Sequence, residues 1–272
     1  MKHPSLTVIT ACFIFISGCT HNAITGKSQL SLFVSESDAE TLALTQYNKF
    51  LDTNTVVPAS NHQAQMVKRV GSRIAKAITD YYSKPGQPSA FADYKWEFNL
   101  VESKEINAWC MPGGKVVVYT GLLPVTQNET ALAIVLGHEI GHAVLGHGLA
   151  RLNQAYVNAG IQQLGSAALG GNTKAANIFN AVYVPGTTLA VALPNSRAQE
   201  YEADHYGLLF AALAGYDPRE AIPFWQRMMK LGSAGSKPPA FLSDHPADED
   251  RITKLQGYMP EALKLYKPNT VK

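Results

Sequence analysis

Two histidines and a glutamate stand close together near the middle of the sequence, at His138, Glu139 and His142. On a helix, positions four residues apart differ by only about 40° in direction, so both imidazoles can reach one ion. Zinc accepts neutral imidazole nitrogen, and a catalytic zinc site leaves a position for a water molecule whose pKa the ion lowers. A glutamate beside the ligands can take the proton of that water. The HExxH pattern therefore predicts two metal ligands, His138 and His142, and a general base, Glu139.

The residues around the motif favour a metal site over the alternative of a buried helix with structurally paired histidines. Residues 131–136 are all apolar, whereas a solvated His/Glu face needs no apolar residues on every side. Gly141 lies between the two histidines, and a glycine inside a helix costs about 1 kcal/mol relative to alanine. We therefore expect another backbone, or a substrate, to approach closely at Gly141.

A third ligand should come from a separate helix, and Glu200 is the best candidate. Asp204 follows it by four residues on the same face, so it can hydrogen-bond the far nitrogen of a ligating histidine and fix its tautomer. Glu202 points roughly the other way and is expected to be an exposed charge. His147 lies about 140° around the helix from His142, which predicts a structural or exposed histidine rather than a ligand.

Helical and extended patterns around these residues predict a mainly helical α+β domain with a small sheet beside the HExxH helix. The expected helices and strands are helices over 37–51 and 60–82, strands over 94–101, 106–111 and 115–120, a helix from 126 through the motif, one or two helices with a flexible connection in 155–193, and helices over 195–214, from 217 and after 246. Capping boxes are expected at Ser37 with Glu40 and at Thr126 with Glu129.

The N-terminus has the pattern of an export signal followed by a lipid attachment site. Residues 1–18 combine a short cationic start with an apolar stretch that is too short to cross a bilayer. The run Ile16-Ser17-Gly18-Cys19 resembles a bacterial lipobox, which predicts a signal peptide over 1–18 and acylation of Cys19. The alternative is an ordinary secretory signal with an incidental cysteine. Thr20 lacks the acidic character that favours inner-membrane retention, so we expect lipid anchoring to the outer membrane of a bacterial envelope, facing the periplasm.

The remaining boundaries and the composition describe one folded unit. A lipidated tether is expected over 19–34, the domain over 35–262 and a C-terminal tail over 263–272, since 46% apolar residues suffice for one core. A net charge of +2 without a lysine or arginine cluster excludes nucleic acid as a partner. Cys110 is the only thiol left after processing, so no intrachain disulfide is expected. It is predicted to be a packed thiol, with metal ligation or an intermolecular disulfide as alternatives.

Several motifs together resemble a known family. These are GHEIGHAVLGH, the distal SRxxExxAD, the run 214–218 and Asp244-His245-Pro246, and they resemble the zinc metallopeptidase family of the CAAX prenyl protease and HtpX. The lipobox resembles the periplasmic lipoprotein branch of that family, with LoiP and BepA. The resemblance spans about residues 30–260. It implies a zincin-like metalloprotease domain with one zinc ion per chain, and it gives the same roles to His138, His142, Glu139, Glu200 and Asp204 as the spacing does.

The resemblance also implies roles for two further segments. Asn107 and Ala108 match the family's edge-strand segment, which implies backbone pairing with an extended peptide substrate. Trp109-Cys110 depart from the family's pattern and leave the subsite preference open. His245 is expected at an outward-facing cap position at the start of the last helix, which by itself predicts an ordinary loop histidine, but in the family it matches a loop over the zinc cleft. That match implies that His245 either occupies the open coordination position or donates to the oxyanion formed during attack.

We therefore expect a zinc-dependent metalloendopeptidase of the bacterial cell envelope that hydrolyses unfolded or misassembled envelope proteins, a substrate class that comes from the resemblance. One alternative is a zinc-containing envelope lipoprotein that acts mainly as a chaperone or assembly factor. Glu139 discriminates between them, because a purely structural zinc site has no need of a general base. The other alternative is a non-enzymatic lipoprotein with a chance motif, which its metal content would reveal. The sequence leaves the oligomeric state open.

Overall fold

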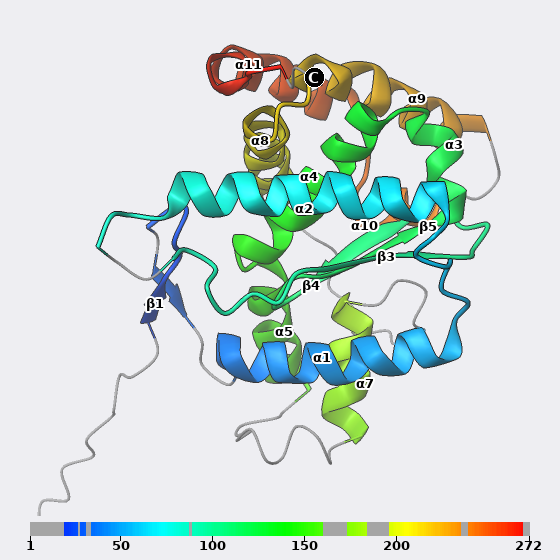
Figure 1. Ribbon diagram of the computed structural model, residues 1–272. Coiled ribbons are helices and arrows are strands. Elements are labelled where there is room, and N and C mark those ends of the chain that lie inside the picture. The colour runs from blue at the N-terminus through cyan, green and yellow to red at the C-terminus, as the bar shows by residue number, and fades with distance from the viewer. Residues whose placement is uncertain are drawn as a thin grey trace, which may run out of the picture.

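The computed structural model describes residues 19–26, 28–30, 34–86, 89–159, 173–183, 196–234 and 239–268. These residues form a mainly helical α+β domain with a three-stranded sheet, which confirms the predicted fold class (Figure 1). The predicted signal peptide and much of the segment 155–193 lie outside the described residues. Among the described helices, none has the length and apolar character needed to cross a membrane.

The described elements follow one another along the chain as β1 (Cys19–His21), β2 (Ser28–Leu30), α1 (Glu36–Thr53), α2 (His62–Tyr82), β3 (Glu97–Val101), β4 (Ala108–Met111), β5 (Lys115–Tyr119), the 3₁₀ turn η1 (Thr120–Leu122), α3 (Leu123–Thr126), α4 (Glu129–Val144), α5 (His147–Asn158), α7 (Thr173–Tyr183), α8 (Arg197–Leu213), the 3₁₀ turn η2 (Pro218–Glu220), α9 (Ala221–Ala234), α10 (Ala240–Asp244) and α11 (Glu249–Leu265).

The three-stranded sheet has the order β3-β5-β4, with β3 parallel and β4 antiparallel to β5. The turn between β4 and β5 needs positive φ angles at Gly113 and Gly114, at 73° and 82°, which a residue with a Cβ rarely adopts. Because β5 is central, β4 is an edge strand of the sheet, as the resemblance implied.

Apolar side chains pack on both faces of this sheet. Successive residues of a strand point to opposite faces, so Val116 and Val118 join the hydrophobic cluster that includes α2, α4 and α8. Val117 and Tyr119 join the second cluster, with α1, α5 and α7. Figure 1 shows α2 and α1 on opposite sides of the sheet. The HExxH helix α4 is therefore buried in the larger of two clusters.

Small residues let α4 and α8 cross at very short range. A Cβ added at Gly137 would lie 2.5 Å from the carbonyl oxygen of Gly207, and one at Gly141 would lie 3.4 Å from that of Ala203. The backbone whose close approach was expected at Gly141 is thus that of α8. This crossing places the first two turns of α8, with Glu200 and Asp204, directly beside the motif.

Two of the predicted helix starts are wrong by a few residues. The capping box of α1 is formed by Ser35 and Asp38 instead of Ser37 and Glu40. The cap of α4 is Asn128, whose side chain accepts a hydrogen bond from the amide of Ala131. Asparagine caps as well as serine or threonine, and several such residues compete in both segments.

Residues on both sides of the predicted domain boundaries take part in regular structure or contacts. Helix α11 continues to Leu265, so the first residues of the expected C-terminal tail belong to this helix. In the expected tether, β1 and β2 form an antiparallel pair, and the Asn22 side chain donates a hydrogen bond of 2.7 Å to the carbonyl of Val144. Val34 is fully buried. Part of the segment 19–34 therefore packs on the domain.

Candidate metal centre

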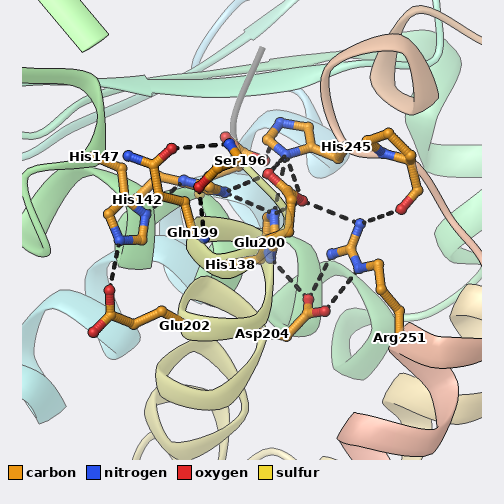
Figure 2. Close-up of polar contacts among 12 residues, drawn as sticks. His138, His142, His147, Ser196, Gln199, Glu200, Glu202, Asp204, His245 and Arg251 are labelled. Atoms are coloured by element: carbon orange, nitrogen blue, oxygen red, sulfur yellow. Dashed lines mark hydrogen bonds and ion pairs between the residues drawn. The ribbon is translucent and has the colours of Figure 1, made fainter. Parts of the chain in front are cut away.

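Four buried side chains converge at one point below the sheet: His138 and His142 from α4, Glu200 from α8, and His245 from the end of α10 (Figure 2). One ligand atom from each lies within 4.8 Å of the others. The separations are 3.1 Å from His138 Nε2 to His142 Nε2, 3.3 Å from His142 Nε2 to Glu200 Oε1, 3.5 Å from His138 Nε2 to Glu200 Oε2, 3.1 Å from His138 Nε2 to His245 Nδ1, and 3.0 Å from His245 Nδ1 to Glu200 Oε1.

These separations fit a single zinc ion. Zinc bonds of 2.0–2.1 Å in a tetrahedron place neighbouring ligand atoms roughly 3.3 Å apart. The five separations, between 3.0 and 3.5 Å, lie around that value. In the part of the chain that the structure describes, this is the one group of histidine, cysteine, aspartate or glutamate side chains with metal-ligand spacing. Its donor set of three imidazoles and one carboxylate is typical of zinc.

A carboxylate fixes the orientation of the His138 ring. Asp204 Oδ1 lies 3.0 Å from His138 Nδ1, so the proton of this imidazole is held on Nδ1 and Nε2 faces the centre. The structure thus shows the contact that the spacing of Glu200 and Asp204 predicted for Asp204. Burial acts to raise the pKa of Asp204, but the charge of Arg251 and the hydrogen bonds with His138 and Arg251 together outweigh it, so the pKa is lowered.

Arg251 of α11 is a site residue that the sequence analysis missed. Its guanidinium donates to both oxygens of Asp204, at 2.7 and 2.6 Å, and its Nη1 lies 3.1 Å from Glu200 Oε2. The same group stacks on the ring of Trp225, 3.7 Å from its centroid. The sequence did contain a signal for this role. Arg251 lies four residues before Leu255, on the buried face of α11, and an arginine buried there without a partner for its charge would be costly.

His142 is oriented through a second histidine. Its Nδ1 lies 3.0 Å from Nδ1 of His147, whose Nε2 lies 3.0 Å from Glu202 Oε2. If His147 donates to Glu202, its Nδ1 can accept from His142, which leaves Nε2 of His142 free for the metal. His147 is thus structural, as predicted, but Glu202 is not the exposed charge that was expected, because α5 brings His147 to it.

The electrostatics of the centre favour a neutral imidazole at His142 and an ionised carboxylate at Glu200. Burial lowers the pKa of His142 well below its ordinary value. Burial also acts to lower the pKa of His138, yet hydrogen bonds to Asp204 and Glu200 outweigh it and raise the pKa. For Glu200, burial acts to raise the pKa, but the surrounding histidines, His245 first, lower it well below its usual range. The carboxylate is therefore charged at neutral pH, as metal binding requires.

Glu139 is buried beside the centre without belonging to the ligand group. Its Oε1 lies 3.4 Å from Nε2 of His245. Burial raises the pKa of Glu139 to about 7, and the charge of a bound cation would act in the opposite direction. A carboxylate poised near neutral pH can accept a proton and give it back.

The position of His245 corrects the sequence analysis. The last helix begins only at Glu249, with Asp248 as its cap, so His245 does not face outward from that helix. It caps the C-terminus of the short helix α10 instead and is only 6% exposed. Its ring packs against Phe241, with centroids 4.7 Å apart. In this conformation His245 lies in the metal centre as a fourth potential ligand.

The segment expected to pair with substrate is buried. Asn107 and Ala108 are each 1% exposed, and the Asn107 side chain accepts a hydrogen bond of 2.9 Å from the amide of Ala108. The amide of Phe241 in α10 donates to the carbonyl of Ile106, at 3.2 Å. Groups on this edge are therefore engaged in the present conformation. Cys110 is a buried free thiol, and burial, followed by the charge of Glu139, raises its pKa well above the ordinary value.

An HExxH helix with a glutamate from a second helix defines the site of a zincin-like metallopeptidase. The chain belongs to peptidase family M48, whose sequence model matches residues 61–259. That family uses zinc, so the expectation of one zinc ion per chain is confirmed by the family and by the four-residue cluster.

Several proteases are similar to this chain. It is 34% identical over 174 residues to the mitochondrial metalloendopeptidase OMA1 of Schizosaccharomyces pombe, which covers 64% of this chain and 50% of the relative. It is 30% identical over 260 residues to the human mitochondrial metalloendopeptidase OMA1, and the match covers 89% of this chain and 46% of the relative. It is 29% identical over 165 residues to the beta-barrel assembly-enhancing protease of Escherichia coli O157:H7, and the match covers 60% of this chain and 34% of the relative. The chain spans about half the length of the curated relatives it matches.

The comparisons confirm the predicted resemblance at the level of the family. Bacterial β-barrel assembly-enhancing proteases are among the relatives, at low identity. The similarity to the mitochondrial OMA1 enzymes is stronger, and it does not place the chain specifically with the CAAX prenyl protease, HtpX or LoiP. Membership of the periplasmic lipoprotein branch and acylation of Cys19 stay predictions.

Proposed function

We propose that this protein is a zinc-dependent metalloendopeptidase. The observation that carries the proposal is the placement of Glu139, which is buried against the metal centre yet outside its group of ligands. A site that used zinc only for stability, or only to hold a peptide, would have no need of a base there. Family membership and the names of the relatives support the same activity.

In this proposal His138, His142 and Glu200 hold the ion. Zinc bound there supplies a Lewis acid for the peptide carbonyl and lowers the pKa of a water molecule. Glu139 accepts the proton of that water and returns it to the leaving amine. Asp204 and His147 keep the two imidazoles of the motif in the tautomer that binds metal.

We propose that the conformation described here is a resting state. Nδ1 of His245 completes the group of four ligand atoms, and Nε2 of the same ring faces Glu139. Helix α10 also holds the carbonyl of Ile106 at the sheet edge through the amide of Phe241. A shift of α10 would therefore free the water position, the base and the substrate-pairing edge together.

We further propose that the protein works at the bacterial cell envelope on unfolded or misassembled proteins, anchored through lipid on Cys19. The lipobox at residues 16–19 supports the anchor. The name of the bacterial relatives, which describes enhancement of β-barrel assembly, supports a role in quality control. Labelling with a fatty-acid analogue tests the anchor, since Cys19→Ser should abolish labelling, and equal labelling of both forms would refute it.

The activity is tested with the purified mature protein and its Glu139→Gln variant. Both should bind one equivalent of zinc, because Glu139 is not a ligand, but only the parent should cleave unfolded casein, and only without chelator. Glu200→Gln should weaken zinc binding instead. Chelator-sensitive cleavage by Glu139→Gln at the parent rate would contradict the mechanism. Zinc binding without any cleavage by the parent would favour the chaperone alternative.

A further inference from the structure

A cavity of about 690 Å³ opens at the C-terminal end of the HExxH helix. Its lining includes Ala143 and Val144, the residues that follow the metal ligand His142 in the chain. Pro112, directly after β4, closes another side. The lining of the cavity also includes residues from the first turns of α1 and α5. The cavity thus adjoins both the last turn of the catalytic helix and the end of the strand expected to bind substrate.

Three carboxylates surround this cavity: Glu36 and Glu40, four residues apart on α1, and Asp93. Among the described residues, no lysine or arginine forms an ion pair with them. Burial, followed by the like charges of Glu36 and Asp93, raises the pKa of Glu40 to about 7. A cation between the three groups would relieve this repulsion.

One residue of the cavity wall carries an unsatisfied hydroxyl group. Tyr183 of α7 lines it and is only 7% exposed, and its hydroxyl finds no hydrogen-bond partner within the described ranges. The ring is fixed against Gly148, where an added Cβ would come within 2.3 Å of a ring carbon. A buried hydroxyl without a partner among the described residues is costly, and a polar group of a ligand in the cavity would relieve that cost.

Aromatic side chains in the cavity walls indicate which kind of ligand would fit. Phe91, Tyr94 and Tyr183 line the cavity together with the carboxylates. Aromatic faces attract cations and accommodate the methylene groups of a long side chain. The three carboxylates do not approach one another as metal ligands do, since the zinc centre is the one such group in the described chain. The cavity therefore suits an extended organic cation better than a metal ion.

We propose that this cavity is a specificity pocket for a lysine or arginine side chain of the peptide substrate. The inference rests on the proposed endopeptidase function, because a peptide paired with β4 would leave that strand at Pro112 and place a side chain in the cavity. Glu40 also packs on the turn after β4, where a Cβ at Gly113 would lie 3.4 Å from its Cγ. The carboxylates bind the cationic end, and the Tyr183 hydroxyl accepts one of its N–H groups.

Matched fluorogenic peptides test the pocket with the zinc-loaded mature protein. They carry lysine, arginine, norleucine or glutamate at one position at a time, and kcat/KM is measured for each. At one position the kcat/KM of the lysine or arginine peptide should exceed that of the norleucine peptide by about tenfold, as expected for a partly buried charge pair. The double variant Glu40→Gln/Asp93→Asn should lose most of this ratio, which is taken between two peptides cleaved by the same preparation. Glu102→Gln, an exposed change outside the cavity, is the control.

The outcomes separate the pocket from the proposed function. A basic-to-norleucine ratio near one at every position, or a ratio unchanged in the double variant, would overturn the pocket. If no peptide is cleaved, the proposed function fails and the pocket is tested by fluorescence anisotropy. Tighter binding of the lysine peptide, lost in the double variant, would then support the pocket. Equal affinities of the lysine and norleucine peptides would overturn it. So would binding of spermidine that the lysine peptide does not displace. Tyr183→Phe, which removes no contact within the described chain, should lower the preference without altering folding.

Discussion

At the scale of single residues, the centre depends on the groups that orient its imidazoles as much as on the ligands. Each histidine of the motif is held by a carboxylate of α8, His138 directly by Asp204 and His142 through His147 by Glu202. A ligand held in one tautomer and one orientation loses less freedom when the metal binds. The contribution of Glu202 can therefore be measured as zinc affinity.

Glu202→Gln should weaken zinc binding by about 10- to 100-fold, the usual effect of losing such an orienting partner. The physical reason is that an amide can donate to His147 and so favour the wrong tautomer of His142. Competition with a chromogenic chelator measures the change. Glu261→Gln breaks a His–Glu contact of α8 outside the metal centre, that with His205, and serves as control. If both variants bind zinc equally well, the relay through His147 has no role in metal binding.

At the scale of elements, the site depends on the crossing of α4 and α8. Gly137→Ala would place a methyl group 2.5 Å from the backbone of Gly207, so α8 would have to move away. We expect a loss of about 1–3 kcal/mol in the free energy of unfolding, as for other overpacked interiors, and weaker zinc binding because Glu200 moves with α8.

Chemical denaturation with and without zinc measures both effects. Gly257→Ala is the matched control, since a Cβ there meets no atom within 4 Å on the exposed side of α11. It should stabilise the protein by about 1 kcal/mol, through helix propensity alone. Equal stabilities of the Gly137→Ala variant and its parent would show that the crossing tolerates separation.

Sequence patterns predicted those features well that depend on residues close together in the sequence. The HExxH spacing, the strands around the Gly113-Gly114 turn and the pairing of Glu200 with Asp204 on one helical face all follow from helix and strand periods. Arg251 and the contact of Glu202 with His147 were missed, because both join helices that are distant in the sequence. No periodicity carries that information.

At the scale of the whole molecule, α10 closes the site. His245→Ala should increase peptidase activity and let a chelator remove zinc faster, because the fourth position and the neighbourhood of Glu139 become free. Steady-state kinetics and zinc release, measured on the same preparation, check the prediction. His62→Ala, at an exposed position, is the control. A lower kcat with unchanged zinc content would instead assign His245 to stabilisation of the oxyanion.

If Cys19 carries lipid as predicted, the contact between Asn22 and Val144 would hold the active site close to a membrane. Asn22 is three residues after Cys19, so with lipid on Cys19 the chain between bilayer and domain spans at most roughly 10 Å. Val144 ends the HExxH helix, two residues past His142. An enzyme anchored so closely, through the helix that carries its metal ligands, would not reach substrates far from the membrane. It would act only on polypeptide chains that emerge from, or fail to enter, the bilayer to which it is anchored.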